Sequence, residues 1–187
     1  MASIYKLRPQ EFIKYQQHLL SLDAESKYMR FGFHASDAKI TELVNAWQDN
    51  SKEHVIFVIE NSELEVIAVG HISTELPQVE IALSVLKQYQ GKGLGSSLMS
   101  KCVAWCQNRG VKSVGMVCLP QNYAVKKIAK QHGLVVTENG ESAAILNVPD
   151  MNTLSVLDEY FSDRISLLDH LAKSQIMVMN RLRSQFK

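Results

Sequence analysis

The stretch from Glu80 to Ser96, EIALSVLKQYQGKGLGS, decides how the chain is organised. Its apolar first part predicts a strand over 79–86. The glycine-rich part from Gly91 to Gly95 predicts a tight turn, and a helix over 96–108 follows it. Glycines let a backbone come close to a ligand, and the N–H groups of such a turn can converge on phosphate oxygens at the positive end of a helix. The stretch therefore predicts either a pyrophosphate cradle or a strand-to-helix turn that binds nothing.

Two common phosphate-binding motifs do not fit the spacing of these glycines. A dinucleotide-binding fingerprint needs a third glycine where Ser96 stands and an acidic residue about 20 positions further on, where the chain has none. A P-loop ends in Gly-Lys-Ser or Gly-Lys-Thr, whereas Gly91 and Lys92 are followed by Gly93. The turn therefore belongs to neither class.

Charge is unevenly distributed along a nearly neutral chain. The 187 residues carry 20 basic and 19 acidic side chains, which gives a formal net charge of +1. Eight of the basic residues and none of the acidic ones lie between Ile81 and Thr137. A compact basic segment suits a small anionic ligand better than a nucleic acid, which needs a broad basic face. We therefore expect no nucleic-acid partner.

The periodicity of the apolar residues predicts an α/β domain with a mixed central sheet and helices on both faces. Strands are also predicted over 4–7, 54–60, 66–73 and 113–118, with a hairpin of 134–137 and 143–148 around Glu138-Asn139-Gly140-Glu141. Further helices are predicted over 9–20, 23–30, 36–50 and 122–131.

The last segment, 152–187, is predicted to be a long helix or two helices with one continuous apolar stripe. The stripe consists of Leu154, Leu157, Phe161, Ile165, Leu168, Ala172, Ile176, Met179, Leu182 and Phe186. It either packs on its own domain or forms a homodimer interface, since a straight helix of about 36 residues would span about 54 Å. We therefore divide the chain into a domain over 1–149 and a helical extension over 150–187.

Cysteine usage and hydropathy indicate the cellular compartment. No stretch approaches the roughly 20 apolar residues of a membrane span, and the chain does not open on a basic segment followed by an apolar run. Cys102, Cys106 and Cys118 are odd in number and lack metal-ligand spacing, so we expect buried, reduced thiols. The sequence therefore predicts a cytoplasmic protein with no bound metal and no membrane partner.

Three separate motifs together give a specific resemblance. Gln88, Gly91 and Gly93 form a Gln-x-x-Gly-x-Gly pattern that resembles the acyl-CoA pyrophosphate loop of the GNAT superfamily of N-acetyltransferases. The strand before the loop resembles the fourth strand of that family, and the segment from Asn122 to Leu134 resembles its second cofactor motif. The resemblance covers residues 4–148 and implies a GNAT-like fold with acetyl-CoA as the acyl donor.

The resemblance also implies where acetyl-CoA binds. In this family the strand before the loop splays from its neighbour and the pantetheine arm lies in the gap. An N–H group of Leu83 or Val85 would then polarise the acyl carbonyl, and Asn122 would contact the pantetheine chain. The residues implied at the pyrophosphate are Gln88, Tyr89, Gln90, Gly91, Lys92, Gly93, Leu94, Gly95 and the hydroxyl of Ser96.

The implied reaction is direct attack of a primary amine on the acetyl group in a ternary complex. An amine with a pKa of about 10.4 arrives mostly protonated, so a positioned base assists the attack. Glu80 is the candidate base, and we expect its carboxylate in a cleft on the strand face that it shares with Ser84.

One departure from the family pattern concerns the general acid. Many members place a tyrosine seven residues after the asparagine to protonate the leaving thiolate, whereas this chain has Ala129. Ser84, Tyr89 and Tyr123 are candidate substitutes, and solvent could also supply the proton. The alternative function is a non-catalytic CoA-binding module that regulates or recruits a partner.

The acceptor is left open by the sequence. A polyamine, a protein lysine, a protein N-terminus and an aminoglycoside all fit a small-molecule or protein amine. Residues 26–34 fall where the family has its acceptor-side helices. There Tyr28, Arg30, Phe31 and Phe33 either line a pocket or pack a helix on the sheet.

Overall fold

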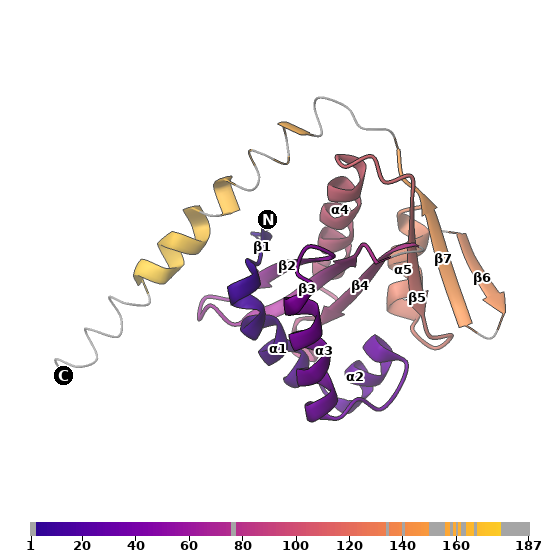
Figure 1. Ribbon diagram of the computed structural model, residues 1–187, viewed down its shortest axis with the longest axis horizontal. Helices are drawn as coiled ribbons and strands as arrows, with labels where there is room; N and C mark the ends of the chain where they lie inside the picture. Colours follow the sequence, from indigo (N-terminus) through magenta and orange to yellow (C-terminus); the bar gives the residue numbers. More distant parts are fainter. Residues whose placement is uncertain are drawn as a thin grey trace.

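The computed structural model describes residues 3–75, 78–133, 135–139 and 141–149, and residues 156–157, 159, 161, 164–166 and 168–176 of the C-terminal segment. Over these residues the chain builds a seven-stranded sheet in the order β1-β2-β3-β4-β5-β7-β6 (Figure 1). The strands are β1 (Tyr5–Lys6), β2 (His54–Glu60), β3 (Val66–Ser73), β4 (Val79–Val85), β5 (Ser113–Cys118), β6 (Val135–Asn139) and β7 (Glu141–Asn147). Neighbouring strands are antiparallel except β4 and β5, which are parallel. The predicted mixed sheet is confirmed.

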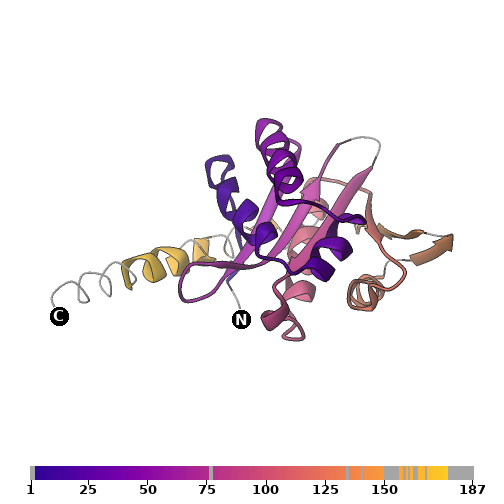
Figure 2. The same cartoon turned by 90° about the horizontal axis from the view of Figure 1, so that it is seen from below.

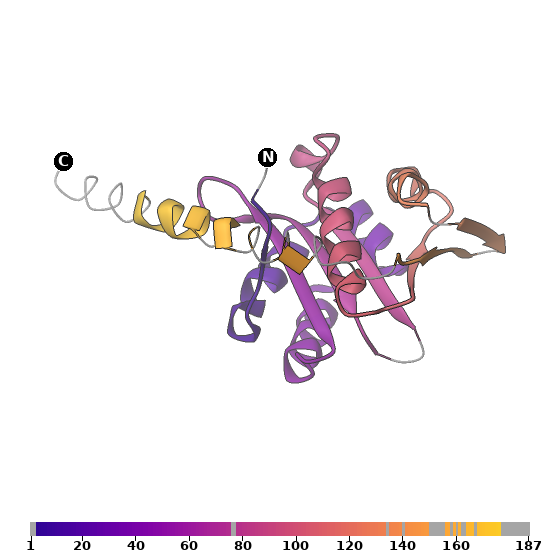
Figure 3. The ribbon, with the colours of Figure 1, turned by 90° about the horizontal axis from the view of Figure 1, so that it is seen from above.

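Helices cover both faces of the sheet (Figures 2 and 3). On one face lie α1 (Phe12–Leu20), α2 (Ala24–Phe31) and α3 (Asp37–Asp49), and on the other lie α4 (Leu94–Gln107) and α5 (Tyr123–Gln131). Single 3-10 turns, η1 (Pro9–Glu11) and η2 (Lys87–Tyr89), precede α1 and follow β4. The side chains of Asp23 and Ser36 accept backbone N–H bonds at the starts of α2 and α3, which fixes where both helices begin.

The core has two layers because β2 is buried on both faces. Val55, Phe57 and Ile59 pack in the layer under α4, whereas Ile56 and Val58 pack in the layer under α1 and α3. A strand covered on both sides is expected to be apolar throughout, and residues 54–60 are all buried.

Helix α4 packs closely on the sheet at Gly70 of β3. A Cβ atom at Gly70 would lie 2.8 Å from the Sγ atom of Cys102 and 3.5 Å from the Cβ atom of Leu98. Cys102 and the other two cysteines are buried and form no disulfide, as predicted, and burial raises the pKa of the Cys102 thiol. These thiols are therefore core side chains.

Several element boundaries differ from the prediction, and α1 starts at Phe12 because residues 9–11 form the 3-10 turn η1. Helix α4 begins two residues earlier than predicted, at Leu94, because the left-handed Gly93 ends the turn and forms its N-cap. The four-residue turn predicted at 138–141 was wrong: β6 runs to Asn139, β7 starts at Glu141, and these two residues pair. Residues 134 and 140 lie outside the described residues. The longer ladder satisfies further backbone N–H and C=O groups that an open turn would leave to water.

The C-terminal segment returns past the end of α4 to the β1 edge of the sheet (Figure 1). Its described residues between 156 and 176 are helical, whereas 150–155 and 177–187 of the predicted extension lie outside the described residues. Its contacts with the domain include two between charged or titratable groups: Arg109 Nη1 lies 3.0 Å from a Glu159 oxygen, and His170 Nδ1 lies 2.9 Å from Glu60 Oε2. Ile165 and Leu168 of the apolar stripe are both 66% exposed.

Candidate active site

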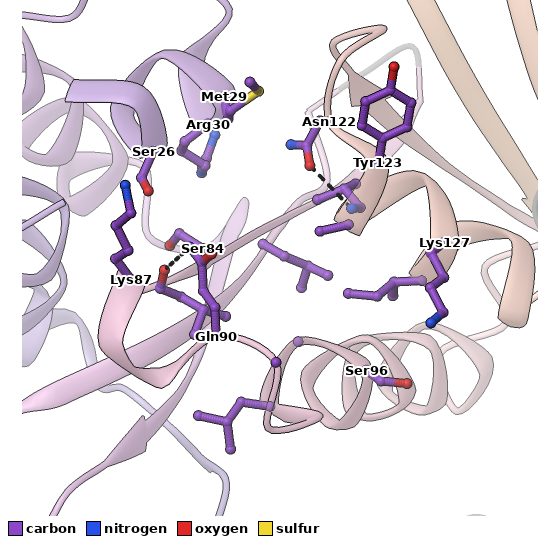
Figure 4. A pocket seen from close by; sticks show the side chains of 18 of the residues that line it. Ser26, Met29, Arg30, Ser84, Lys87, Gln90, Ser96, Asn122, Tyr123 and Lys127 are labelled. Atoms are coloured by element: carbon purple, nitrogen blue, oxygen red, sulfur yellow. Dashed lines mark hydrogen bonds between the residues drawn. The ribbon is translucent and has the colours of Figure 1, made fainter. Parts of the chain in front are cut away.

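A cavity of about 620 Å³ opens where β4 and β5 separate (Figure 4). Parallel pairing of these strands in the described residues joins Val79 to Val114 and Glu80 to Gly115, at the beginning of β4. Beyond Glu80 the two strands diverge, as expected for the family. The wall is formed by α2, the end of β4, the loop after it, the first turn of α4, and one face of α5 along its length.

The free edge of β4 presents backbone donors toward this gap. The N–H of Leu86 bonds to the carbonyl of Ile67 on β3 at 3.0 Å, and β4 pairs with β3 along its length. Because successive N–H groups of a strand point to opposite edges, those of Val85 and Leu83 point away from β3. The side-chain amide of Gln90 also bonds to the Val85 carbonyl, at 3.1 Å, on this open edge. The two N–H groups that the resemblance assigns to the acyl carbonyl are thus placed on the gap.

The loop after β4 has the conformation that a phosphate cradle requires. Gly91 and Gly93 adopt left-handed backbone angles, with φ of 73° and 78°, and open space surrounds both Cα atoms. Gly93 caps α4, so the unpaired N–H groups of its first turn point out of the helix end toward the cavity wall. Gly95 is held against α5, since a Cβ there would lie 2.9 Å from Ile128 Cδ1.

Most of the predicted residues reach the cavity. The predicted residues that line it are Leu83, Ser84, Val85, Tyr89, Gln90, Gly91, Gly93, Leu94, Gly95, Ser96 and Asn122. Gln88 and Lys92 are exposed and are not among the lining residues. The Lys92 Nζ atom lies 5.0 Å from the centroid of the Tyr89 ring.

Helix α5 forms the wall opposite β4 (Figure 4). Asn122 Oδ1 accepts the N–H of Val125 at 3.2 Å, so this residue begins the helix as well as lining the cavity. Ala129 is fully buried in the core and is not a lining residue. Of the candidate substitutes for the missing acid, Ser84, Tyr89 and Tyr123 all line the cavity.

Glu80 lies apart from this group. It stands at the start of β4, where it pairs with Ser73 and Gly115, and it is exposed. It is not among the residues that line this cavity, which opens at the other end of the strand. The predicted role of Glu80 as a base is not tested by this placement.

Ser84 has a partner that sequence reasoning missed. Its Oγ lies 2.9 Å from His18 Nε2, and His18 Nδ1 lies 2.9 Å from the carbonyl oxygen of Val66. A carbonyl can only accept, so Nδ1 carries the imidazole proton, and Nε2 of the neutral ring accepts the proton of the Ser84 hydroxyl. Burial lowers the pKa of His18 to about 4, with a further contribution from the charge of Arg30.

Helix α2 forms the part of the cavity wall where the resemblance implies the acceptor side. Ser26, Met29 and Arg30 line it from one face of the helix (Figure 4). The Arg30 Nη2 atom lies 3.0 Å from the Tyr15 hydroxyl and 3.2 Å from His71 Nδ1. Burial lowers the pKa of His71 well below its usual value, and the Arg30 charge acts in the same direction. Arg30 thus lines the pocket, whereas the Phe31 and Phe33 rings contact each other.

Among the residues of this site, His18, Ser26, Met29 and Lys87 were not predicted, whereas Arg30 was one of the candidates for a pocket wall. His18 lies on the buried face of α1 with Phe12, Tyr15 and Leu19. A histidine on an otherwise apolar helix face was the available signal. Lys87 and Lys127 add positive charge to the wall, and the Nζ atom of Lys87 lies 3.6 Å from a Glu25 oxygen.

Comparison with known proteins identifies the family. The Acetyltransferase (GNAT) family matches residues 17–134, so the chain belongs to this family. Its fold is similar to that of the GNAT domain of S. lividans PAT, with a TM-score of 0.65, 19% identity, and coverage of 77% of this chain and 89% of that one. A phosphinothricin acetyltransferase from Sinorhizobium meliloti, solved in complex with AcCoA, gives a TM-score of 0.60, 15% identity and coverage of 82% and 91%. An N-acetyltransferase from Staphylococcus aureus Mu50 gives a TM-score of 0.59 and 15% identity, with coverage of 80% of this chain and 99% of that one.

Proposed function

We propose that this protein transfers an acetyl group from acetyl-CoA to a primary amine, by direct attack in a ternary complex. The observation that carries the proposal is the gap between β4 and β5, which ends at a left-handed glycine loop and a helix N-terminus. An extended chain with a pyrophosphate at one end has the shape and charge that such a site accommodates.

The residues present fit acetyl-CoA. Backbone N–H groups between Gly91 and Ser96 would hold the pyrophosphate, and Lys127 would add charge. The N–H groups of Leu83 and Val85 would donate to the acyl carbonyl, whose oxygen gains negative charge as the amine attacks. Removal of one such donor typically costs a factor of 10² to 10³ in rate, or about 3 kcal/mol.

The first test is calorimetric titration with acetyl-CoA. We expect micromolar binding by the wild type and strong weakening in Gly91→Glu, which places a carboxylate in the cradle. Gly110→Glu is the matched control, because Gly110 also has a left-handed φ, of 70°, and open surroundings but does not line the cavity. Wild-type protein that does not bind acetyl-CoA at millimolar concentration would refute the proposal.

The second test separates the enzyme from a non-catalytic CoA-binding module. Thiol release from acetyl-CoA is followed with a panel of amines, including a polyamine, a lysine peptide and an aminoglycoside. Amine-dependent release supports the enzyme, whereas tight binding without release from any amine supports the module. Glu80→Gln in the same assay tests the predicted base, which from its exposed position would have to act through a water.

The C-terminal segment supports a homodimer as part of this proposal. Leu157, Ile165, Leu168 and Ile176 are each at least 48% exposed and recur at helical spacing, and a second copy would bring an identical stripe. The structure has no helix among its described residues that is long and apolar enough to cross a membrane. The buried cysteines, which form no disulfide, support the predicted cytoplasmic location.

A further inference from the structure

Within the described residues, Ser84 is the only polar side chain of β4 that lines the cavity, and it is hydrogen-bonded to the buried His18. Ser84 is 8% exposed and His18 is 2% exposed. The ring of His18 is fixed at both nitrogens, by the Val66 carbonyl on β3 and by the Ser84 hydroxyl on β4. These two hydrogen bonds fix the orientation of the imidazole, so that the lone pair of Nε2 points to the Ser84 hydroxyl.

We propose that Ser84 and His18 carry the proton that acetyl transfer moves from nitrogen to sulfur. This proposal rests on the proposed function. Ser84 lies between Leu83 and Val85, whose N–H groups point into the gap, so its hydroxyl oxygen is adjacent to the expected position of the acyl carbonyl. Because its own proton points to His18, its lone pairs are available to an N–H group in the cavity.

The proton transfers balance without another reactant. As the nitrogen–carbon bond forms, Ser84 Oγ takes a proton from the attacking nitrogen and passes its own proton to His18 Nε2. As the carbon–sulfur bond breaks, the sulfur keeps the bonding electrons, takes a proton from Ser84 Oγ, and Ser84 recovers its proton from His18. The net change is an amide and a free thiol, with Ser84 and His18 restored.

The surroundings of His18 favour return of the proton. Burial and the positive charge of Arg30 on α2 both disfavour the imidazolium form, so it is a stronger acid than an exposed imidazolium. Tyr15 on α1 and His71 on β3 are also buried on this face, and both are bonded to Arg30. The pair would therefore perform both the base step and the acid step, which explains how a chain with Ala129 in the place of tyrosine can act.

The tautomer of His18 tests the geometry without any catalytic assay. Nitrogen-15 NMR of the wild-type histidine rings should show one ring protonated at Nδ1 over the neutral pH range, with an Nε2 resonance that shifts in Ser84→Ala. A His18 ring protonated at Nε2 would overturn the proposal, whether or not the protein binds acetyl-CoA.

Kinetics test the role, with acetyl-CoA as donor and hydroxylamine as a small, largely uncharged acceptor. We expect Ser84→Ala and His18→Gln each to lower kcat about a hundredfold, with little change in KM for acetyl-CoA, and the double variant to lose no more. The ratio of variant to wild-type kcat should approach one at high pH, where hydroxide replaces the lost base. His54→Gln, a buried histidine that does not line the cavity, is the control and should stay within threefold.

Two outcomes would refute the relay while leaving the proposed function intact. One is a loss of kcat that is the same at every pH, which a purely structural defect would give. The other is full additivity of the two substitutions. Failure of the wild type to bind acetyl-CoA would instead refute the proposed function itself.

A different observation, the charge on the acceptor side, carries a second inference. Arg30 lines the cavity, and its hydrogen-bond partners within the described residues are the neutral Tyr15 and His71. Its guanidinium group lies over the rings of Phe31 and Trp47, and it forms no ion pair with a carboxylate among the described residues. Glu25, an acidic lining residue, is paired with Lys87 instead.

We infer that the acceptor is an amine that also carries a carboxylate. A partly buried guanidinium without an acidic partner is costly unless a ligand neutralises it, and its fork fits a carboxylate. The orientation of Arg30 is fixed by four side chains, so little ordering is needed on binding. A polyamine, by contrast, would meet like charge.

The test compares alanine, methionine and phenylalanine with their carboxamides as acceptors, with rates expressed per concentration of neutral amine. We expect the wild type to favour the carboxylates at least tenfold and Arg30→Gln to lose that preference. Lys27→Gln is the control on the same helix, because Lys27 pairs with Asp37 at 2.8 Å and does not line the cavity. An equal or reversed wild-type preference would overturn the inference, and a ratio of rates is insensitive to partial unfolding of a variant.

Discussion

The buried His18 makes a quantitative prediction about stability and pH. Its pKa is about 4 in the folded protein and 6.5 in an exposed ring. Between these values the unfolded chain binds a proton that the folded chain excludes, so the free energy of unfolding falls as the pH falls. The contribution is complete above pH 6.5 and is lost on the way down through pH 4.

The magnitude follows from the two pKa values. Between pH 8 and pH 5, the free energy of unfolding should lose about 2 kcal/mol through His18, out of about 3 kcal/mol for the full titration. His54 and His71, whose pKa values burial also lowers, add to the acid sensitivity in the same direction. Carboxyl groups whose pKa is lowered by hydrogen bonds, such as Asp23, add to the acid sensitivity only at lower pH.

Comparison with a variant isolates the His18 contribution. In His18→Gln all other titrating groups remain, so its stability should fall by about 2 kcal/mol less than that of the wild type between pH 8 and pH 5. In urea unfolding at an m value of about 2 kcal/mol/M, the gap between the two midpoints should change by about 1 M. His34 is exposed, so His34→Gln is the control. The difference between its urea midpoint and that of the wild type should stay the same from pH 8 to pH 5. Parallel curves for His18→Gln would refute the assignment of a buried, neutral imidazole.

Four further predictions concern packing, the loop and the extension. Gly70→Ala should lower the free energy of unfolding by about 1–3 kcal/mol in urea, because its Cβ would overlap Cys102. Gly93→Ala should lower it by about 1–2 kcal/mol through backbone strain and should weaken acetyl-CoA binding in calorimetry. Lys127→Gln should reduce the salt dependence of acetyl-CoA affinity, since it removes a cation from the cavity wall. Light scattering should give a dimer mass for the full chain and a monomer mass for Leu168→Glu, and equal monomer masses for both would exclude the interface.

The sequence was most informative where one residue type has few alternatives. The glycine loop was predictable because left-handed angles at Gly91 and Gly93 strongly favour glycine, and the boundaries of β2, β3 and β5 followed from apolar runs bounded by polar residues. The divergence of β4 from β5 came only with the family resemblance, since no local pattern in β4 distinguishes a paired strand edge from an open one.

The contacts that join His18, Ser84 and Arg30 to their neighbours were not predictable, for a physical reason. His18, Arg30 and Ser84 lie on three elements, and the distances that join them depend on how α1 and α2 pack on the sheet. Glu80 illustrates the reverse case. Strand alternation places it on the same face of β4 as Ser84, but alternation does not indicate at which end of β4 the cavity opens. Periodicity determines the face of a residue, and tertiary packing determines its neighbours.

Under the proposed function, the two faces of β4 would separate the two substrates. Leu83 and Val85 pack against the α4 layer, where the glycine loop and Lys127 would form the donor site, whereas Ser84 points to α1 and shares the other face with Arg30. The strand edge between these faces carries the N–H groups that would meet the acyl carbonyl. An amine entering from α2 would therefore reach the carbonyl on the side where Ser84 and His18 can take its proton. It follows that substitutions on the α1 side should change acceptor kinetics and those on the α4 side should change acetyl-CoA binding.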